Sequence, residues 1–440
     1  MALRYFWQMH PSALVLYARD GFIQVGMFPY RLKRVQDWYA GVARTHYLRF
    51  AFLRRGDPEL MRSLVSACQK PLIAVASPEY YCRTARAFGN LLDRSMEHYP
   101  DEHRGIAAKV DSELDAGLEH MLKSIDSRTV NGTTHDSYGF LNWGDGLHYA
   151  WQPGVAEPGN LSWNHHYYDL PHMSCLEFAR SGRLEWYEYF FTRAHHLMDV
   201  HMTHFGPENE LTGRNRYNPP TEHVRIDPRR RNDYASAPVY ISPSPNHHKT
   251  QSLFERWLLS GDERARDIAM QGTAFVAGLG GYTDFKQPRG AAHQVMTLIT
   301  AYRVTGDTDC LDIAGATFDL WYDHFQNTSA KFTQGYFMAG FLLEAFIDYY
   351  EATGDERVVE FVKQAIDWMV AERGDDKFPN LALGAGFVAV KTGDPKYTAI
   401  QKDYLSHWKG VHNNAFKDFA SNGRSVARSL YYLSDEAWNK

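Results

Sequence analysis

The stretch QVMTLITAYRVTGDTDC, residues 294–310, carries the pattern that decides the fold. Apolar residues recur at helical spacing up to Thr305, then Gly306 follows, and Asp307 begins the next segment. Glycine readily takes the left-handed conformation that ends a helix, and aspartate caps the first turn of a following helix. The stretch therefore predicts a helical hairpin with a short turn.

The same Gly-Asp signal recurs along the chain. Its six copies, one of which has arginine in place of aspartate, begin at residues 55, 181, 260, 305, 353 and 392. Gly261, Gly306, Gly354 and Gly393 are separated by 45, 48 and 39 residues, a length typical of one helical hairpin with its loops. We therefore predict a mainly α-helical protein in which about six hairpins close into an α/α toroid.

The N-terminal region has a different texture. Runs such as FIQVGMF and THYLRFAF are short, apolar and rich in aromatic and β-branched residues, as in strands. Helical spacing begins at Asp57 and Pro58, which together form a helix-start signal. We predict a β-rich segment over residues 1–54, the remnant of a β-sandwich, and an α/α toroid over residues 55–440.

Composition narrows the classes of partner. The chain has 440 residues, 44% of them hydrophobic, and a net charge of −5, which favours neither nucleic acid nor a membrane surface as a partner. It has no apolar run of about 18 residues, so no transmembrane helix is expected. The first residues lack the order of a secretion signal. This start fits a cytoplasmic protein or a chain shortened at its N-terminus, and the sequence indicates no oligomeric state.

Titratable side chains concentrate in four stretches. These are NWGDG (142–146), NHHYYDLPH (164–172), RAHHLMDVHMTH (193–204) and PNHHKTQ (245–251). Two polar segments, residues 126–163 and 205–247, interrupt the helical repeat around them. Long loops inside a compact domain are commonly functional, and loops grouped on a rigid scaffold often form sites. We therefore expect the functional site here.

A metal site is one possible use of these histidines. His196 and Asp199 are three residues apart, as are His201 and His204, so each pair would share a face of an α-helix. However, the sequence has no HExxH motif, and no compact set of three ligands stands out. We predict no metal and no cofactor. A serine nucleophile is also disfavoured, because no GxSxG motif occurs.

Carbohydrate chemistry fits the residue types better. A glycosidase needs two facing carboxylates, for which Asp145, Asp169 and Asp199 are candidates. A polysaccharide lyase instead removes the proton at C5 of a uronic acid and expels the oxygen at C4. That reaction needs a base such as histidine or tyrosine, together with cationic or amide donors for the carboxylate. Arg225, in RIDPRRRND, is one such cation, and aromatic residues, 14% of the chain, suit stacking on sugars.

Several motifs in one order resemble the exo-rhamnogalacturonan lyase/YetA-like family. FWQMHPSALVL and THYLRF are similar to the end of its β-sandwich, and NWGDG, NHHYYDLPH, ARSGRLEWYEYFFTRAHHLMDVHMTHFG and NHHKTQSLFERWLLSGDERA are similar to its α/α-toroid domain. The resemblance covers residues 3–320. It implies an N-terminal β-barrel and a β-sandwich before the toroid, most of which this chain lacks. It also implies an acidic residue where this chain has Tyr167, which weakens a glycosidase pairing there.

We therefore expect a polysaccharide lyase that acts by β-elimination on an acidic oligo- or polysaccharide, with a rhamnogalacturonan-like substrate implied by the resemblance. Tyr168 or His166 is the expected base, and His165 or His247 the acid or carboxylate partner. The expected substrate-binding residues are Trp143, Asp145, Trp163, Asn164, Asp169, His196, Asp199, His248 and Arg225. The alternatives are a glycoside hydrolase that removes uronic acids, like a β-glucuronidase, and a non-catalytic carbohydrate-binding scaffold.

Overall fold

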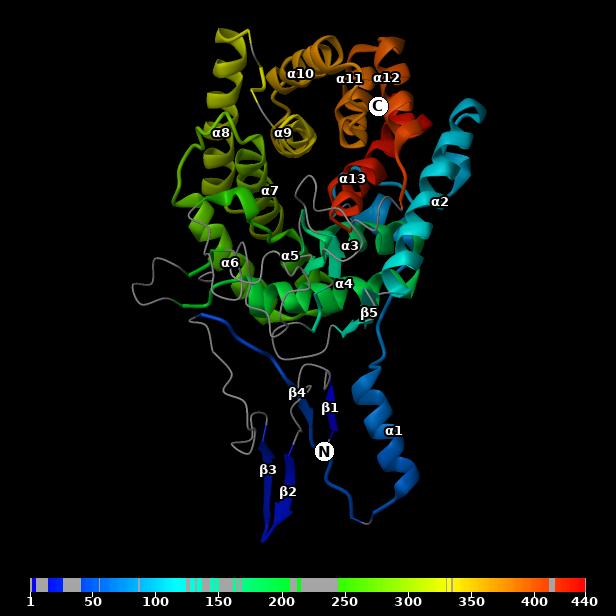
Figure 1. Ribbon diagram of the computed structural model, residues 1–440, viewed down its shortest axis with the longest axis vertical. Coiled ribbons are helices and arrows are strands. Elements are labelled where there is room, and N and C mark those ends of the chain that lie inside the picture. The colour runs from blue at the N-terminus through cyan, green and yellow to red at the C-terminus, as the bar shows by residue number, and fades with distance from the viewer. Residues whose placement is uncertain are drawn as a thin grey trace.

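The computed structural model is mainly α-helical, with a few short strands (Figure 1). This confirms the prediction of a mainly α-helical protein. The structure describes residues 2–4, 15–26, 41–54, 56–85, 88–123, 127–130, 133–136, 143–145, 147–149, 161–163, 166, 168–205, 212–214, 244–329, 331–333, 335–410 and 416–439.

Most of the helices lie in the part of the chain that begins at residue 170. The α-helices are α1 (Pro58–Gln69), α2 (Asp101–Lys123), α3 (Leu170–Ser181), α4 (Leu184–His196), α5 (Gln251–Ser260), α6 (Glu263–Ala277), α7 (Pro288–Thr305), α8 (Thr308–Asn327), α9 (Ala339–Thr353), α10 (Arg357–Arg373), α11 (Ala382–Thr392), α12 (Pro395–His407), α13 (Phe416–Ser429) and α14 (Asp435–Trp438). Two π-helices are η2 (Tyr80–Ala85) and η4 (Leu197–His201), and the 3₁₀ turns are η3 (Met96–His98), η6 (Pro245–His247), η7 (Tyr336–Met338), η8 (Pro379–Leu381) and η9 (Leu430–Leu433).

Every second helix takes part in a closed circuit of contacts. Helix α3 contacts α5, and the chain of contacts continues through α7, α9, α11 and α13, which returns to α3. The intervening helices lie against this circuit: α4, α6, α8 and α10 each contact the circuit helices on both sides of them in sequence. Helix α12 contacts α11, and α2 contacts α12 and α13. Each hairpin thus contributes one circuit helix and one flanking helix.

The burial of the helices explains these two positions. Circuit helices are buried all round: in α9 every residue from Ala339 to Tyr349 is buried, and in α11 every residue from Ala382 to Ala389. A helix that is apolar all round needs neighbours on every side. Flanking helix α8 buries only one face, including Phe318, which packs on aromatic rings of α9 and α10. Its other face carries the polar residues expected at a surface.

The predicted Gly-Asp turns are confirmed at most of the repeats. Gly182, Gly261, Gly306, Gly354 and Gly393 each follow a helix and have φ between +68° and +75°. The interpretation of the first copy, RGDPEL, was wrong in one respect. Gly56 does not end a helix, because strand β4 precedes it, although Asp57 does cap α1.

The strands form two-stranded antiparallel pairs. β1 (Ala2–Arg4) pairs with β4 (Tyr47–Arg49), and β2 (Val15–Arg19) pairs with β3 (Phe22–Gly26). β5 (Ser127–Val130) pairs with β6 (Thr133–Asp136), and β7 (Leu147–Tyr149) pairs with β8 (Leu161–Trp163). Helix α1 contacts β1, and Figure 1 shows both beside β2–β4, below the other helices. The N-terminal region is thus β-rich, as predicted.

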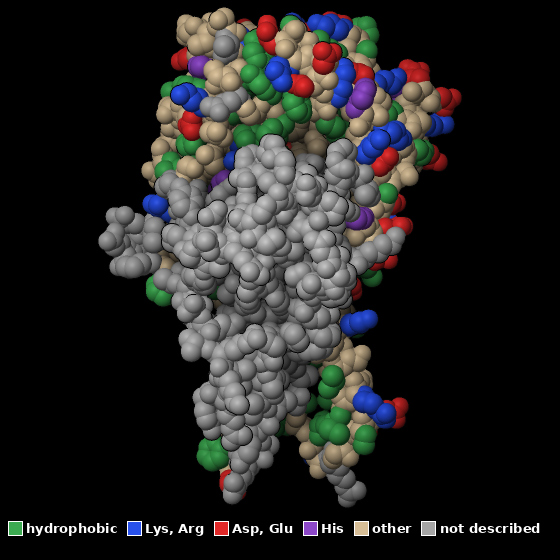
Figure 2. All heavy atoms as spheres, viewed as in Figure 1, with side chains coloured by type: hydrophobic (Ala, Val, Ile, Leu, Met, Phe, Trp, Pro, Cys, Tyr) green, Lys and Arg blue, Asp and Glu red, His purple; other side chains and the backbone are tan. Residues whose placement is uncertain are grey.

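Charged side chains of both signs are visible on one face of the molecule (Figure 2). On the face in Figure 2, acidic and basic side chains of the described residues are intermingled over the helical part. Among the helices that the structure describes, none combines the length and apolar character that a membrane crossing requires.

Candidate functional site

The stretch that contains Tyr168 is a strained turn at the start of α3. His166, Tyr168 and Asp169 have φ of +48°, +58° and +56°, although none of them is glycine. Each left-handed residue of this kind costs about 1–3 kcal/mol and persists only where its surroundings enforce it. Three of them within four residues indicate that the direction of these side chains matters more than local stability.

Contacts with distant helices hold this turn. The Asp169 carboxylate accepts hydrogen bonds from the backbone N–H groups of His172 (3.4 Å) and Ser252 (3.3 Å), which joins the starts of α3 and α5. Arg424 on α13 donates to the carbonyl oxygen of Tyr168 at 3.2 Å. The Tyr168 ring stacks on Phe341 of α9, with the ring centres 4.6 Å apart. Four helices therefore fix the position of Tyr168.

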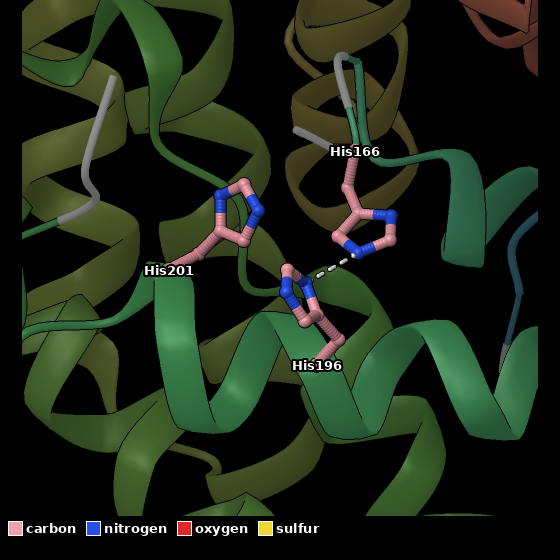
Figure 3. Close-up of side chains that lie close together, drawn as sticks. All are labelled: His166, His196 and His201. Atoms are coloured by element: carbon pink, nitrogen blue, oxygen red, sulfur yellow. Dashed lines mark hydrogen bonds between the residues drawn. The ribbon is translucent and has the colours of Figure 1, made fainter. Parts of the chain in front are cut away.

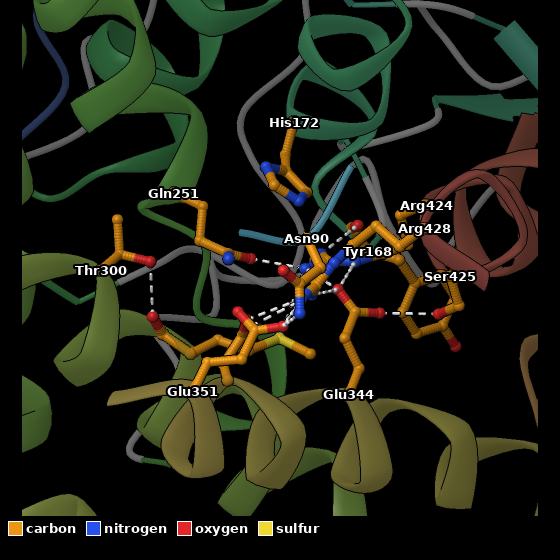
Figure 4. Close-up of polar contacts among 12 residues, drawn as sticks. Asn90, Tyr168, His172, Gln251, Thr300, Glu344, Glu351, Arg424, Ser425 and Arg428 are labelled. Atoms are coloured by element: carbon orange, nitrogen blue, oxygen red, sulfur yellow. Dashed lines mark hydrogen bonds and ion pairs between the residues drawn. The ribbon is translucent and has the colours of Figure 1, made fainter. Parts of the chain in front are cut away.

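A buried network of ion pairs anchors Arg424 in turn. Arg424 donates to Glu344 at 2.9 and 3.0 Å and to the Gln251 side chain at 2.6 Å. Arg428, one turn later, pairs with Asp348 at 2.8 Å and with Glu344 at 3.3 Å. Figure 4 shows both arginines reaching Glu344. Burial alone would raise the pKa of Asp348, but the positive charge of Arg428 holds it below its usual range. Asp348 is therefore ionised, and its negative charge balances that of Arg428.

The Tyr168 hydroxyl lies beside two further polar groups. Arg289, in the first turn of α7, donates from Nη1 to the Tyr168 hydroxyl at 3.3 Å. Its Nη2 lies 3.4 Å from Nε2 of His247, which is half-buried. A tyrosine, an arginine and a histidine thus meet in one row, with phenol and imidazole on either side of a guanidinium.

A small cavity adjoins the turn on the side of Asp169. Its lining includes Asp169, His248, Lys249, His293 and Arg424. Burial lowers the pKa of Lys249 to about 8, against the opposing effect of Asp169 and Asp145. Burial, together with the charge of Lys249, lowers the pKa of His248 to about 3. His248 therefore stays neutral near pH 7, and Lys249 gives up its proton more easily than a lysine at the surface.

His166 takes part in a separate cluster of histidines. His166, His196 and His201 are fully buried, and one ligand nitrogen of each lies within 4.8 Å of the others. Nε2 of His166 and Nδ1 of His196 are 3.0 Å apart and share a hydrogen bond. Figure 3 shows the three rings facing one another: His196 comes from the end of α4, His201 from η4 and His166 from the turn.

A π-helix brings two of these histidines together. In an α-helix, residues five apart would point about 140° away from each other. The chain from Leu197 to His201 instead forms a π-helix, in which five residues make somewhat more than one turn, so His196 and His201 share a face. The predicted shared face of His196 and Asp199 was wrong for the same reason: the extra residue in the turn moves Asp199 off that face.

Asp199, predicted to contact substrate, holds three segments of the chain together. It is fully buried, and its oxygens accept hydrogen bonds from the backbone and hydroxyl of Thr45, at 2.5 and 2.9 Å, and from Arg264 at 3.0 Å. His195 lies 3.4 Å away. The positive charge of nearby groups holds the pKa of Asp199 below its usual range despite burial. This carboxylate joins the N-terminal segment to α4 and α6.

Residues 143–145, the described part of NWGDG, lie against α4. Trp143, predicted to stack on a sugar, is buried and packs edge-on to His195, and its contact with a sugar stays a prediction. Its carbonyl oxygen accepts a hydrogen bond from Arg44 at 3.0 Å. Gly144, with φ of +97°, packs directly on His196. Asp145 is buried, and its negative charge raises the pKa of Lys249 against the effect of burial.

Some predicted site residues cannot be compared with the structure. Asn164, His165, Tyr167 and Arg225 lie outside the described residues, and nothing is described of the side chain of Trp163. Of the others, Tyr168, His247, Asp169 and His248 lie around the row and the cavity, while His166 and His196 belong to the histidine cluster.

The sequence analysis did not predict Arg289 as a site residue, and it assigned no role to Lys249 within PNHHKTQ. A signal for Arg289 was present in the motif QPRG, where Pro288 begins α7. A cation in the first turn opposes the helix dipole, which favours negative charge there. An arginine placed against this preference indicates a partner elsewhere, here Tyr168 and His247.

The comparisons with known proteins identify no relative. The sequence matches no family model, and no curated protein is significantly similar to it.

Proposed function

We propose that this protein is a polysaccharide lyase that acts on a uronic-acid-containing substrate by β-elimination. The observation that carries the proposal is the row formed by the Tyr168 hydroxyl, the Arg289 guanidinium and His247. Elimination needs a base, a cation beside the substrate carboxylate and a proton donor for the leaving oxygen. The row contains one group suited to each task.

The roles follow from the chemistry of each group. Tyr168 acts as the phenolate, whose negative charge Arg289 stabilises: its oxygen takes the C5 proton, and the electron pair of the C–H bond forms the C4–C5 double bond as the C4–O bond breaks. His247 gives a proton to the departing oxygen. Arg289 neutralises the carboxylate while negative charge spreads into it, as an oxyanion hole does in acyl transfer. Tyr168 is only 1% exposed, so substrate must approach it from the side of the half-buried His247.

The scaffold belongs to the same proposal. We infer that the circuit from α3 to α13, with its flanking helices, is an α/α toroid, and that residues 1–54 and 55–440 are separate domains. The closed sequence of helix contacts supports the toroid. It would place the start of α3, with Tyr168, and the start of α7, with Arg289, at one end of the ring.

Product analysis tests the reaction. The chain is incubated with rhamnogalacturonan and, separately, with glucuronides. A lyase generates the ultraviolet absorbance of an unsaturated uronide together with new reducing ends. Reducing ends without that absorbance would establish a hydrolase, and binding without either product would establish a carbohydrate-binding scaffold.

Tyr168→Phe tests the role of the hydroxyl. The variant keeps the ring that stacks on Phe341, so stability changes little, while turnover falls by about 10²–10⁴-fold. Tyr322→Phe is the matched control, because Tyr322 carries its hydroxyl at the surface, bonded to Glu360. Full activity of Tyr168→Phe would remove Tyr168 as the base.

A further inference from the structure

We propose that His166, His196 and His201 form a binding site for one divalent transition-metal ion, of which Zn²⁺ is the representative. The inference does not depend on the lyase proposal, since it stands on other side chains. Three imidazoles are a common ligand set for zinc, with water or an anionic oxygen in the fourth position.

The geometry is close to what a metal ion requires. Zinc–nitrogen bonds of about 2.0–2.1 Å in a tetrahedron place the nitrogens about 3.3–3.4 Å apart. The three ligand atoms lie within 4.8 Å of one another, with His166 and His196 at 3.0 Å. The nitrogens of His166 and His196 are therefore slightly closer together than a tetrahedral zinc site requires. Two ligands come from consecutive turns of one helix, so much of the site is already formed.

The backbone around the cluster is unusual at both places that supply ligands. His166 occupies a left-handed conformation, and His196 and His201 are brought together by a π-turn. π-turns of this kind occur frequently at functional sites. Either feature costs stability, and together they aim three imidazoles at one point. An apolar core would not need this arrangement.

Binding needs only a rearrangement of protons. The proton that His166 and His196 now share moves to the other nitrogen of the ring that carries it. Three neutral imidazoles then present three lone pairs to the metal ion. No oxidation occurs, and no co-reactant is needed. The ion replaces the hydrogen bond between His166 and His196 with two metal–nitrogen bonds.

Metal titration tests the site. The full chain, without a histidine tag, is freed of metal with a chelator and titrated calorimetrically with Zn²⁺. One equivalent should bind, and His201→Gln and His196→Gln should each weaken binding by more than about 100-fold, because a lost ligand costs at least as much as a lost outer-shell partner. His407→Gln, at an exposed position on α12, is the control and should bind as the wild type does.

A second measurement needs no variant. Co²⁺ in a tetrahedral nitrogen site has intense visible absorption, which octahedral Co²⁺ in water lacks. The wild-type chain should show this spectrum at one equivalent and lose it when Zn²⁺ is added. The proposal is overturned if the spectrum stays that of aqueous Co²⁺, or if folded His201→Gln and His196→Gln bind Zn²⁺ as tightly as the wild type.

Discussion

Two buried polar clusters lie on either side of the turn at Tyr168, and they differ in how charge is handled. On one side, Arg424 and Arg428 meet Glu344 and Asp348, so that full positive charges face full negative charges. On the other side, His166, His196 and His201 meet one another. Histidines alone make up this cluster of possible metal ligands among the described residues.

The difference teaches what each cluster can do. A buried ion pair is stable only while both partners remain, and it offers nothing to a ligand because its charges already compensate each other. Neutral imidazoles can stay buried without a counter-ion, and they keep lone pairs that a cation can use. The first cluster therefore fixes the scaffold, and the second has the properties of a site.

The largest expected effect tests the scaffold role of the ion pairs. Arg424→Met leaves the Glu344 carboxylate with fewer partners in a fully buried position. The free energy of unfolding should fall by about 3–5 kcal/mol, as for other buried pairs that lose one partner. Urea denaturation measures the change.

A surface pair is the control for that experiment. Arg357 pairs with Asp355 and Asp319 at exposed positions, so Arg357→Met should cost less than about 1 kcal/mol. Equal losses in the two variants would contradict the scaffold role that we assign to the buried network.

The next effect concerns the support of the histidine cluster. A Cβ atom at Gly144 would lie 2.6 Å from Cβ of His196 and 3.0 Å from the carbonyl oxygen of Thr192, and φ there is +97°. Gly144→Ala should therefore lower the free energy of unfolding by about 2–3 kcal/mol, through strain and overpacking. Thermal unfolding followed by circular dichroism measures it.

Gly393→Ala separates the clash from the backbone strain. Gly393 also has positive φ, +69°, but a Cβ there meets nothing within 4 Å. This variant should lose only about 1 kcal/mol. If Gly144→Ala lost no more than Gly393→Ala, the close packing of NWGDG on His196 would be in error.

A third prediction concerns a buried pair that is neutral. Burial raises the pKa of Glu255 well above its usual range and lowers that of His172 well below it, so the protonated carboxyl group donates to Nδ1 of His172 at 2.5 Å. Above about pH 7 the folded state holds this proton while the unfolded chain has released it. Stability therefore falls as the pH rises toward the folded-state pKa of Glu255.

Glu255→Gln removes this contribution to the pH dependence. The unfolding free energy of the wild type should decrease more steeply than that of the variant, by about 1.4 kcal/mol per pH unit. His172 is uncharged in both states in this range and adds no slope. If the unfolding free energies of the two proteins changed in parallel with pH, Glu255 would be ionised in the folded state. The pair of Glu255 and His172 would then be charged, as the arginine network is.

Local patterns in the sequence predicted the fold, whereas the site depends on contacts between distant residues. Gly306 ends α7 and Asp307 caps α8, and both act within a single turn. The turn can therefore be predicted from adjacent residues in the sequence. Arg289 reaches Tyr168 across more than a hundred residues. The π-turn at Leu197–His201 contains Asp199, which accepts hydrogen bonds from Thr45 and Arg264 in other parts of the chain.

The arginine network could have been predicted from two carboxylates in the sequence. Helix α9 carries Glu344 and Asp348 four residues apart inside an otherwise apolar ladder, FLLEAFIDYY. Because buried carboxylates require partners, such a pair predicts cations at the same spacing on a facing helix. Arg424 and Arg428 on α13 fulfil it, also four residues apart. No comparable rule joins His166 to His196 and His201, since neutral imidazoles need no counter-ion.

The smallest effect concerns a carboxylate that faces no buried charge. Asp307 caps α8 by accepting a hydrogen bond from the backbone N–H of Asp309 at 3.1 Å, at an exposed position. Asp307→Ala should cost about 1 kcal/mol, and Asp307→Asn only a few tenths, because asparagine caps a helix almost as well. Chemical denaturation distinguishes the two variants. A large loss of unfolding free energy in Asp307→Asn would mean that the negative charge matters at this turn as much as it does at Glu344. The helix cap at Asp307 and the buried ion pairs of Glu344 would then not differ in their dependence on charge.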